Sequence, residues 1–243
     1  MTYETIHVQQ QDSICFLRLH RPVISDLLVE ECADALSACE SESTVVVLEG
    51  LPEVFCLGAD LSGVGQQRQD PEPLYDLWLR LATGPFVTVA HVRGKANAGG
   101  LGFVAASDVV IADESAEFSL SELLFGLMPA CVLPFLVRRV GFQRAHYMTL
   151  TAQPLPVQQA HAWQLVDAYA AKSEPLLRRQ LARLRHLNKA SIASYKDYMN
   201  GQSEALLRLR ARALAANRSM FADPQTIAGI VRFTESGLLP WQQ

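Results

Sequence analysis

The sequence predicts an α/β protein in which a layered, partly parallel sheet is followed by a helical region. Apolar strand-like runs alternate with helical patterns through the first half of the chain, which is typical of such sheets. Strand signals become rare after Leu133, where helical patterns dominate. The 243 residues are 49% hydrophobic and 19% charged, with a net charge of −4, so we expect a soluble protein with a packed core.

The chain is expected to open with the order strand, helix, strand. Ile14 to His20 alternates apolar and polar residues, as a half-buried strand does, and Thr44 to Leu48 is a continuous apolar run typical of a buried strand. Between them, apolar residues recur at helical spacing behind Ser25 or Asp26 as N-cap. These apolar residues are Leu28, Cys32, Ala35, Leu36 and Cys39.

Two further strands are predicted at Pro85 to Val92 and Asp108 to Ala112, on either side of the glycine- and alanine-rich stretch 94–106. The stretch from Glu174 to about Phe221 reads as helical. Residues 65–73, GQQRQDPEP, have the composition of a surface loop.

Composition and residue spacing exclude several classes of function. A pI near 5.9 argues against general attraction to nucleic acid. No apolar run reaches the roughly 18 residues of a membrane span and no signal peptide is evident, so we expect a cytoplasmic protein. Neither the five cysteines nor the histidines show the spacing of a metal site, so no metal is predicted. The histidines considered are His91, His146 and His161.

Two glycine-containing turns, each placed after an apolar strand, are the first candidates for chemistry. They are FCLGAD at 55–60 and GKANAGGLGF at 94–103. Glycine allows backbone N–H groups to point into a cavity, and a helix that starts beyond the turn adds a dipole that favours an anion. Taken singly, each turn could equally serve tight packing, and no well-formed dinucleotide fingerprint follows the first strand.

These turns, together with AEFSLSELLFGLMP at 116–129, resemble the enoyl-CoA hydratase/isomerase (crotonase) superfamily over most of the chain. The resemblance implies the crotonase fold, a ββα spiral core with a C-terminal helical region. We place the core at residues 1–195 and the C-terminal covering and trimerisation segment at 196–243. The resemblance also implies a homotrimer or a dimer of trimers.

The family's two oxyanion donors correspond to the backbone N–H groups of Ala59 and Gly99, and we place Gly100 in the same substrate-binding turn. Removal of a proton next to a thioester carbonyl moves negative charge onto the carbonyl oxygen, where such donors stabilise it. Asp60 is assigned to substrate binding as a residue that orients the loop or lines the pocket, with an N-cap role as the alternative.

Glu122 corresponds to one of the two catalytic glutamates of many hydratases in the family. The other glutamate, three residues after the oxyanion glycine, is replaced by Gly102. Glu122 is therefore predicted to move the proton alone or with a substitute for the second carboxylate, although a surface glutamate or a helix N-terminal charge is the alternative. The missing carboxylate makes simple two-glutamate hydration an unsuitable model.

Lys95 and Asn97 stand where relatives often have apolar or aromatic residues. Asn97 could hold a water or a hydroxyl, which makes it a candidate catalytic residue, and Lys95 could pair with a substrate carboxylate. A solvated lysine and a turn asparagine are the alternatives.

The resemblance narrows to one subgroup on the segments EGLPEVFCLGADL, EPLYDLW, VRGKANAGGLGFV, FSLSELLFGLMPACVLPFL and RFTESGLLPW. It implies a lyase of polyketide β-branching that dehydrates 3-hydroxy-3-methylglutaryl-acyl carrier protein to the 3-methylglutaconyl thioester. No cofactor is implied, because the substrate is carried on phosphopantetheine of the carrier protein or on CoA. The basic run Arg178 to Lys189 could dock an acidic carrier protein or be a solvated helix face.

Two alternatives remain at this point. One is a hydratase or isomerase of CoA esters, which shares the oxyanion hole and needs no carrier protein. The other is a catalytically silent interaction protein, which Gly102 makes plausible. A departure from relatives is the short segment from Val23 to Asp26, where relatives have a longer loop that contacts the pantetheine arm.

Overall fold

The computed structural model describes residues 3–61, 70–201, 204–239 and 241–242. Its main sheet has six strands in the order β1-β2-β3-β5-β7-β10. β1 and β2 form an antiparallel hairpin, and the other neighbouring pairs of this sheet are parallel. The strands are β1 (Ile6–Gln11), β2 (Ile14–Leu19), β3 (Val45–Glu49), β5 (Val87–Val92), β7 (Val109–Asp113) and β10 (Ala168–Ala170).

A second sheet of four short strands, in the order β4-β6-β8-β9, is built from segments that follow the strands of the first. They are β4 (Val54–Cys56), β6 (Lys95–Asn97), β8 (Glu117–Ser119) and β9 (Leu155–Pro156). The chain therefore passes from the main sheet to the second sheet three times, at β3 to β4, β5 to β6 and β7 to β8. After the first two crossings it continues into a helix, which gives the ββα repeat that was predicted.

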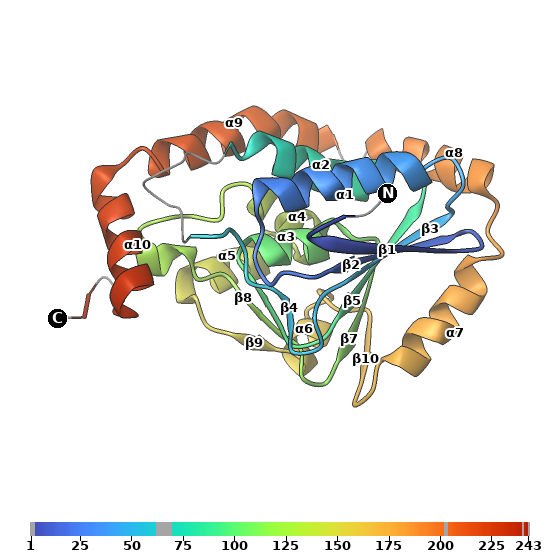
Figure 1. Ribbon diagram of the computed structural model, residues 1–243, viewed down its shortest axis with the longest axis horizontal. Coiled ribbons are helices and arrows are strands. Elements are labelled where there is room, and N and C mark those ends of the chain that lie inside the picture. Colours follow the sequence, from blue (N-terminus) through green and yellow to red (C-terminus); the bar gives the residue numbers. More distant parts are fainter. Residues whose placement is uncertain (1–2, 62–69, 202–203, 240, 243) are drawn as a thin grey trace.

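Helices cover both faces of the main sheet. Val46 and Leu48 point into the large core, which also holds apolar residues of α1 (Asp26–Cys39), α2 (Glu72–Thr83) and α3 (Gly99–Ala106). The alternate residues Val45 and Val47 point to the opposite face and pack with α7 (Glu174–Leu184). Figure 1 shows α7 apart from α1 and α2, with the sheet between them. The period-2 alternation of a strand produces this division.

The remaining helices follow the second sheet. η1 is a 3-10 helix that leads into α4, and α9 and α10 form the end of the chain along one side of the molecule (Figure 1). They are η1 (Glu122–Phe125), α4 (Leu133–Val140), α5 (Phe142–Thr151), α6 (Val157–Ala162), α8 (Lys189–Asn200), α9 (Glu204–Met220) and α10 (Pro224–Ser236). Across the described residues, none of the helices has both the length and the apolar character needed to cross a bilayer.

The first helix confirms its sequence prediction in detail. Ser25 is the N-cap, because its Oγ accepts a hydrogen bond from Leu28 N at 3.2 Å. The predicted apolar residues are all buried, as are the five cysteines. Helical spacing of small apolar residues therefore identified the core face correctly.

Three expectations needed correction. The long helical stretch from Glu174 is three helices, α7, α8 and α9. Residues 168–170, which were read as helical, form strand β10 beside β7. The hairpin strand β1 was not predicted, because its run of polar residues faces solvent. Residue 195 lies inside α8, so the division of the chain at this residue stays a prediction. Of the predicted 65–73 loop, residues 65–69 lie outside the described part of the chain.

Candidate active site

The two glycine-containing turns meet at one place in the structure. A Cβ added to Gly58 would lie 2.8 Å from the Ala98 Cβ and 3.1 Å from Gly99 N. A Cβ added to Gly100 would lie 2.1 Å from Cys56 O. The backbones of the two turns are thus in direct contact, and residues larger than glycine would force them apart. Ala59, which follows Gly58, and Gly99 are therefore brought close together.

The backbone N–H groups of Ala59 and Gly99 have no hydrogen-bond acceptor within the described residues. Their neighbours are paired: Asp60 N donates to Ile24 O at 3.0 Å and Ala98 N donates to Ser119 O at 3.0 Å. Gly99 is also the first residue of α3, so its N–H lies at the positive end of that helix. Two open donors beside each other suit an anionic oxygen.

Ala98 holds the turn in a conformation that is costly for alanine. Its φ is 50° and its ψ is −123°, which lies outside the regions that L-residues usually occupy. Such strain persists only where surrounding structure enforces it, and here β6 pairs with β8 immediately before the residue. The turn is therefore fixed before any ligand binds.

Glu122, at the start of η1, carries the carboxylate of the site. The residue is half-buried, but its Oε2 atom is fully covered and has no hydrogen-bond partner within the described residues. Burial raises the pKa of Glu122 to about 7. A hydrogen bond from its own backbone N–H lowers the pKa, but by less than burial raises it. A carboxyl group with this pKa can both take and return a proton near neutral pH.

Asn97 links the oxyanion turn to the segment that carries Glu122. Its Nδ2 donates to Ser121 Oγ at 3.0 Å, and its Oδ1 accepts from Ser119 Oγ at 2.9 Å. Both ends of the amide are therefore engaged by protein. In this structure Asn97 fixes the residue before Glu122 rather than presenting a free amide to substrate.

Gly102 and Trp78 explain why the second carboxylate is absent. A Cβ added to Gly102 would lie 2.4 Å from Trp78 Cζ2 and 2.6 Å from Trp78 Cε2. The indole therefore occupies the space that any side chain at position 102 would need. Trp78 is 1% exposed and meets the rings of Phe103 and Phe135 edge-on, with centroids 5.9 Å away in both cases.

Lys95 and Asp60 lie around this centre. Lys95 is exposed and projects from the same face of β6 as Asn97, two residues further along. Asp60 is half-buried. Ala59 and Ile24 form an isolated parallel β-bridge, and the Asp60 N–H donates a hydrogen bond of this bridge to Ile24 O. This bridge also holds the short segment from Val23 to Asp26 against the first turn. Both predicted substrate-binding side chains thus belong to the two turns or to the strand that leads into one of them.

A separate buried network lies on the main sheet. His91 Nε2 is 2.7 Å from Ser173 Oγ, and His91 Nδ1 is 2.8 Å from Glu49 Oε1. Burial would raise the pKa of Glu49, but hydrogen bonds from His91 and Arg18 outweigh it and lower the pKa to about 2. His91 and Ser173 are 1% and 0% exposed and are paired with each other, so the network ties the start of α7 to the sheet.

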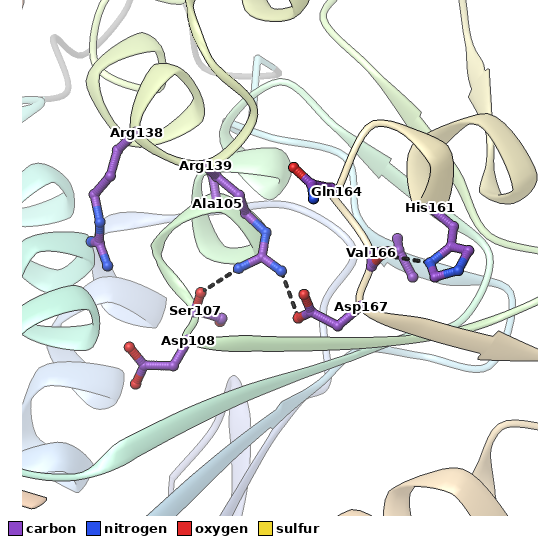
Figure 2. Close-up of a pocket in the computed structure, with 9 residues that line it drawn as sticks. All are labelled: Ala105, Ser107, Asp108, Arg138, Arg139, His161, Gln164, Val166 and Asp167. Atoms are coloured by element: carbon purple, nitrogen blue, oxygen red, sulfur yellow. Dashed lines mark hydrogen bonds and ion pairs between the residues drawn. The ribbon is translucent and has the colours of Figure 1, made fainter.

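A cavity lies elsewhere, between α3, α4 and the segment after α6. It measures about 530 Å³ and is polar, and none of the predicted site residues lines it. Arg139 donates to Ser107 O and Asp167 inside it, while Arg138 is directed away from this pair (Figure 2). Binding pockets for small molecules are mostly apolar, so this cavity is not the candidate for an acyl group.

Three residues around these turns were not identified as site residues from the sequence. Trp78 was read only as part of a resembling segment, because an aromatic residue at helical spacing usually belongs to the core. Ser119 and Ser121 are small polar residues whose role depends on their pairing with Asn97. The only sequence feature that could have identified Ser119 and Ser121 is their position as two serines on either side of Leu120.

Comparison with known proteins agrees with this geometry. The family model described as enoyl-CoA hydratase/isomerase matches residues 9–243. Bacillaene synthase dehydratase PksH of Bacillus subtilis (strain 168) is 56% identical over 254 residues, covering 100% of this chain and 98% of that protein. The 2,3-dehydroadipyl-CoA hydratase of Escherichia coli (strain K12) is 31% identical over 172 residues, covering 66% of this chain and 67% of that protein.

Solved structures show the same architecture. The crystal structure of a polyketide biosynthesis enoyl-CoA hydratase from Bacillus subtilis superposes with a TM-score of 0.96 at 55% identity, covering 98% of this chain and 100% of that one. An enoyl-CoA hydratase/isomerase from Xanthobacter autotrophicus Py2 superposes with a TM-score of 0.87 at 24% identity, covering 98% of this chain and 95% of that one. At this identity the likeness shows the fold alone. The crotonase fold is confirmed, and the chain belongs to the enoyl-CoA hydratase/isomerase family.

Proposed function

We propose that the chain is a hydro-lyase that dehydrates 3-hydroxy-3-methylglutaryl-acyl carrier protein to 3-methylglutaconyl-acyl carrier protein. One observation carries the proposal: a covered carboxylate oxygen of Glu122, without a partner among the described residues, follows Ser121, which is bound to Asn97 two residues from the open donor of Gly99. The 56% identity to a dehydratase of bacillaene synthesis supports water loss as the direction of the reaction.

The proposed mechanism uses Glu122 twice. Its carboxylate takes the proton from C2 of the acyl group, and the electron pair moves to the thioester oxygen, which accepts hydrogen bonds from Ala59 N and Gly99 N. The enolate then reforms the carbonyl, the C2–C3 double bond forms and the C3–O bond breaks. Glu122 returns its proton to the leaving hydroxyl, which departs as water. One donor of such a hole contributes about 3 kcal/mol to transition-state stabilisation.

The substrate's free carboxylate is matched by Lys95. The side chain is exposed, has no ion-pair partner among the described residues, and lies on the Asn97 face of β6. Asp60 and Gly100 are proposed to shape the pocket beside it. No cofactor enters the mechanism, because the chemistry needs only a carboxylate and two N–H donors.

The carrier protein is proposed from the substrate, with phosphopantetheine as its arm. The exposed arginines of α7 are a poor candidate for docking the carrier protein. They lie on the face of the main sheet opposite α3, whose first turn carries the Gly99 donor (Figure 1). Turnover of the CoA ester at the same rate as the carrier-bound ester would favour the CoA-level alternative. Absence of turnover with both would favour the silent interaction protein.

We also propose a homotrimer or a dimer of trimers. The outer face of α5 carries Phe142 and Leu150, which are 66% and 61% exposed. Large apolar side chains exposed on one helix face are typical of surfaces that bind another subunit.

The test is direct. Purified protein is incubated with 3-hydroxy-3-methylglutaryl-acyl carrier protein, and the intact carrier is weighed by mass spectrometry. The proposal expects loss of one water from the carrier-bound group, and no loss with the Glu122→Gln variant. An unchanged mass with folded wild-type protein would refute it.

A further inference from the structure

Trp78 presents a buried hydrogen-bond donor that the fold leaves unused. Its Nε1 atom is covered and has no partner within the described residues. A buried N–H without an acceptor costs free energy, so it calls for a ligand that satisfies it. The indole cannot turn away easily, because the rings of Phe103 and Phe135 pack against it.

The indole that carries this donor packs against the first turn of α3. Nε1 is bonded to Cε2, and Cε2 is the atom that would lie 2.6 Å from a Cβ at Gly102. The neighbouring Cζ2 is 3.8 Å from a Cβ built on Gly99, whose N–H is one of the two open donors. The indole therefore packs along the first turn of α3, the turn that begins with the open donor of Gly99.

Glu122 supplies the complementary group. Its Oε2 is a covered acceptor without a partner within the described residues, and Ser121, the residue before it, is bound to Asn97 two residues from Gly99. Trp78 thus has an unused donor and Glu122 an unused acceptor, and each is linked to the start of α3, Trp78 by its packing against Gly102 and Glu122 through Ser121 and Asn97. A hydroxyl group can satisfy both, because its oxygen accepts from one and its hydrogen binds the other.

We propose that the Trp78 indole N–H donates a hydrogen bond to the 3-hydroxyl oxygen of the substrate and so selects 3-hydroxy thioesters. The inference rests on the proposed function. As the C3–O bond breaks, negative charge grows on that oxygen and the bond from Nε1 strengthens. Trp78 exchanges no proton, and Glu122 still delivers the proton that completes the water.

The test compares Trp78→Phe with Trp163→Phe. The first keeps an aromatic ring and removes only the N–H and part of the volume. The second is the matched control, because Trp163 is half-buried and packs edge-on against Tyr147, away from the site. Each variant is assayed for dehydration of the 3-hydroxy-3-methylglutaryl thioester and for inhibition by the 3-methylglutaryl thioester, which has the carboxylate but no hydroxyl. Thermal unfolding confirms that both variants are folded.

We expect Trp78→Phe to lower kcat/KM about 10- to 100-fold, with inhibition by the 3-methylglutaryl thioester unchanged, and to lower Tm by a few degrees because the smaller ring leaves a cavity. Trp163→Phe should leave all three unchanged. Equal weakening of turnover and inhibition would assign the N–H to the carboxylate and overturn the inference, as would full activity in Trp78→Phe. An inactive wild-type protein would instead refute the proposed function itself. As a second measurement, the indole proton of Trp78 should move downfield by NMR when Glu122→Gln protein binds the 3-hydroxy thioester, and no movement would also overturn the inference.

Discussion

Glu122 occupies an environment that disfavours its charged form. Burial raises its pKa from 4.5 to about 7, so the folded protein binds this proton more tightly than the unfolded chain does. Stability is therefore lost as pH rises from about 4.5 through about 7, by about 3 kcal/mol at 1.4 kcal/mol per pH unit. A site that keeps such a group gives up stability for chemistry.

The first prediction follows from this sign. Glu122→Gln should raise the free energy of unfolding by about 3 kcal/mol at pH 8 and have little effect at pH 4, while turnover is lost. Wild-type kcat/KM should rise with pH through about 7, because the carboxylate form takes the C2 proton. Urea unfolding at both pH values and a pH–rate profile check this. A variant that is less stable at pH 8 would show that Glu122 has a structural partner.

Gly102 gives a second prediction at the same scale. Gly102→Ala would place a Cβ 2.4 Å from Trp78 Cζ2, so the packed indole must move. We expect a loss of about 1–3 kcal/mol in unfolding free energy, the usual cost of overpacking. Gly201→Ala is the control, because no atom lies within 4 Å of a Cβ there. Equal stability of the two variants in chemical unfolding would contradict the packing described for Trp78.

At the scale of elements, α10 covers the segment that holds Glu122. Phe233 meets Phe125 of η1 edge-on, with centroids 4.9 Å apart, and Gly126 ends η1 at a φ of 74°. Phe233→Ala should reduce kcat at least several-fold and lower stability by about 1–2 kcal/mol, because the ring is half-buried. Glu235→Ala, exposed on the same helix, is the control for turnover and thermal unfolding. Full activity in Phe233→Ala would show that α10 does not position η1.

Sequence patterns predicted the long elements better than the short ones. β2, β3 and β5 carry runs of five or six residues with clear strand patterns, whereas β4, β6 and β8 have three residues each and no usable period. The two turns of the site could be predicted from their glycines. The position of Trp78 beside Gly102 could not be predicted. A glycine has no side chain, so the sequence does not show which residue fills the space next to it.

At the scale of the molecule, the buried network around Glu49 joins β3, β5 and the start of α7. Its pKa is lowered from 4.5 to about 2, so it stabilises the fold above pH 4.5, and this stabilisation is lost as pH falls through about 2. Glu49→Gln should cost about 3 kcal/mol at pH 7 and much less at pH 2. Glu42→Gln, at an exposed position, is the control in urea unfolding. A cost independent of pH would show that packing, not charge, explains the loss.

The apolar face of α5 leads to a prediction about assembly. Sedimentation should give the mass of three or six chains, and Phe142→Glu with Leu150→Glu should lower that mass, since two carboxylates would be buried in the interface. The exposed pair Leu187→Glu and Tyr195→Glu, which lies outside residues 196–243, serves as a comparison of equal charge. A wild-type monomer would contradict the proposed trimer.

The central claim is that Glu122 and the donors at Ala59 and Gly99 remove water from a carrier-bound 3-hydroxy acid. The most direct measurement is the mass of 3-hydroxy-3-methylglutaryl-acyl carrier protein after incubation with wild-type protein, compared with Glu122→Gln. We predict loss of one water with the wild type and an unchanged mass with the variant. Equal conversion by both proteins would contradict the account, because water loss would then not depend on the carboxylate.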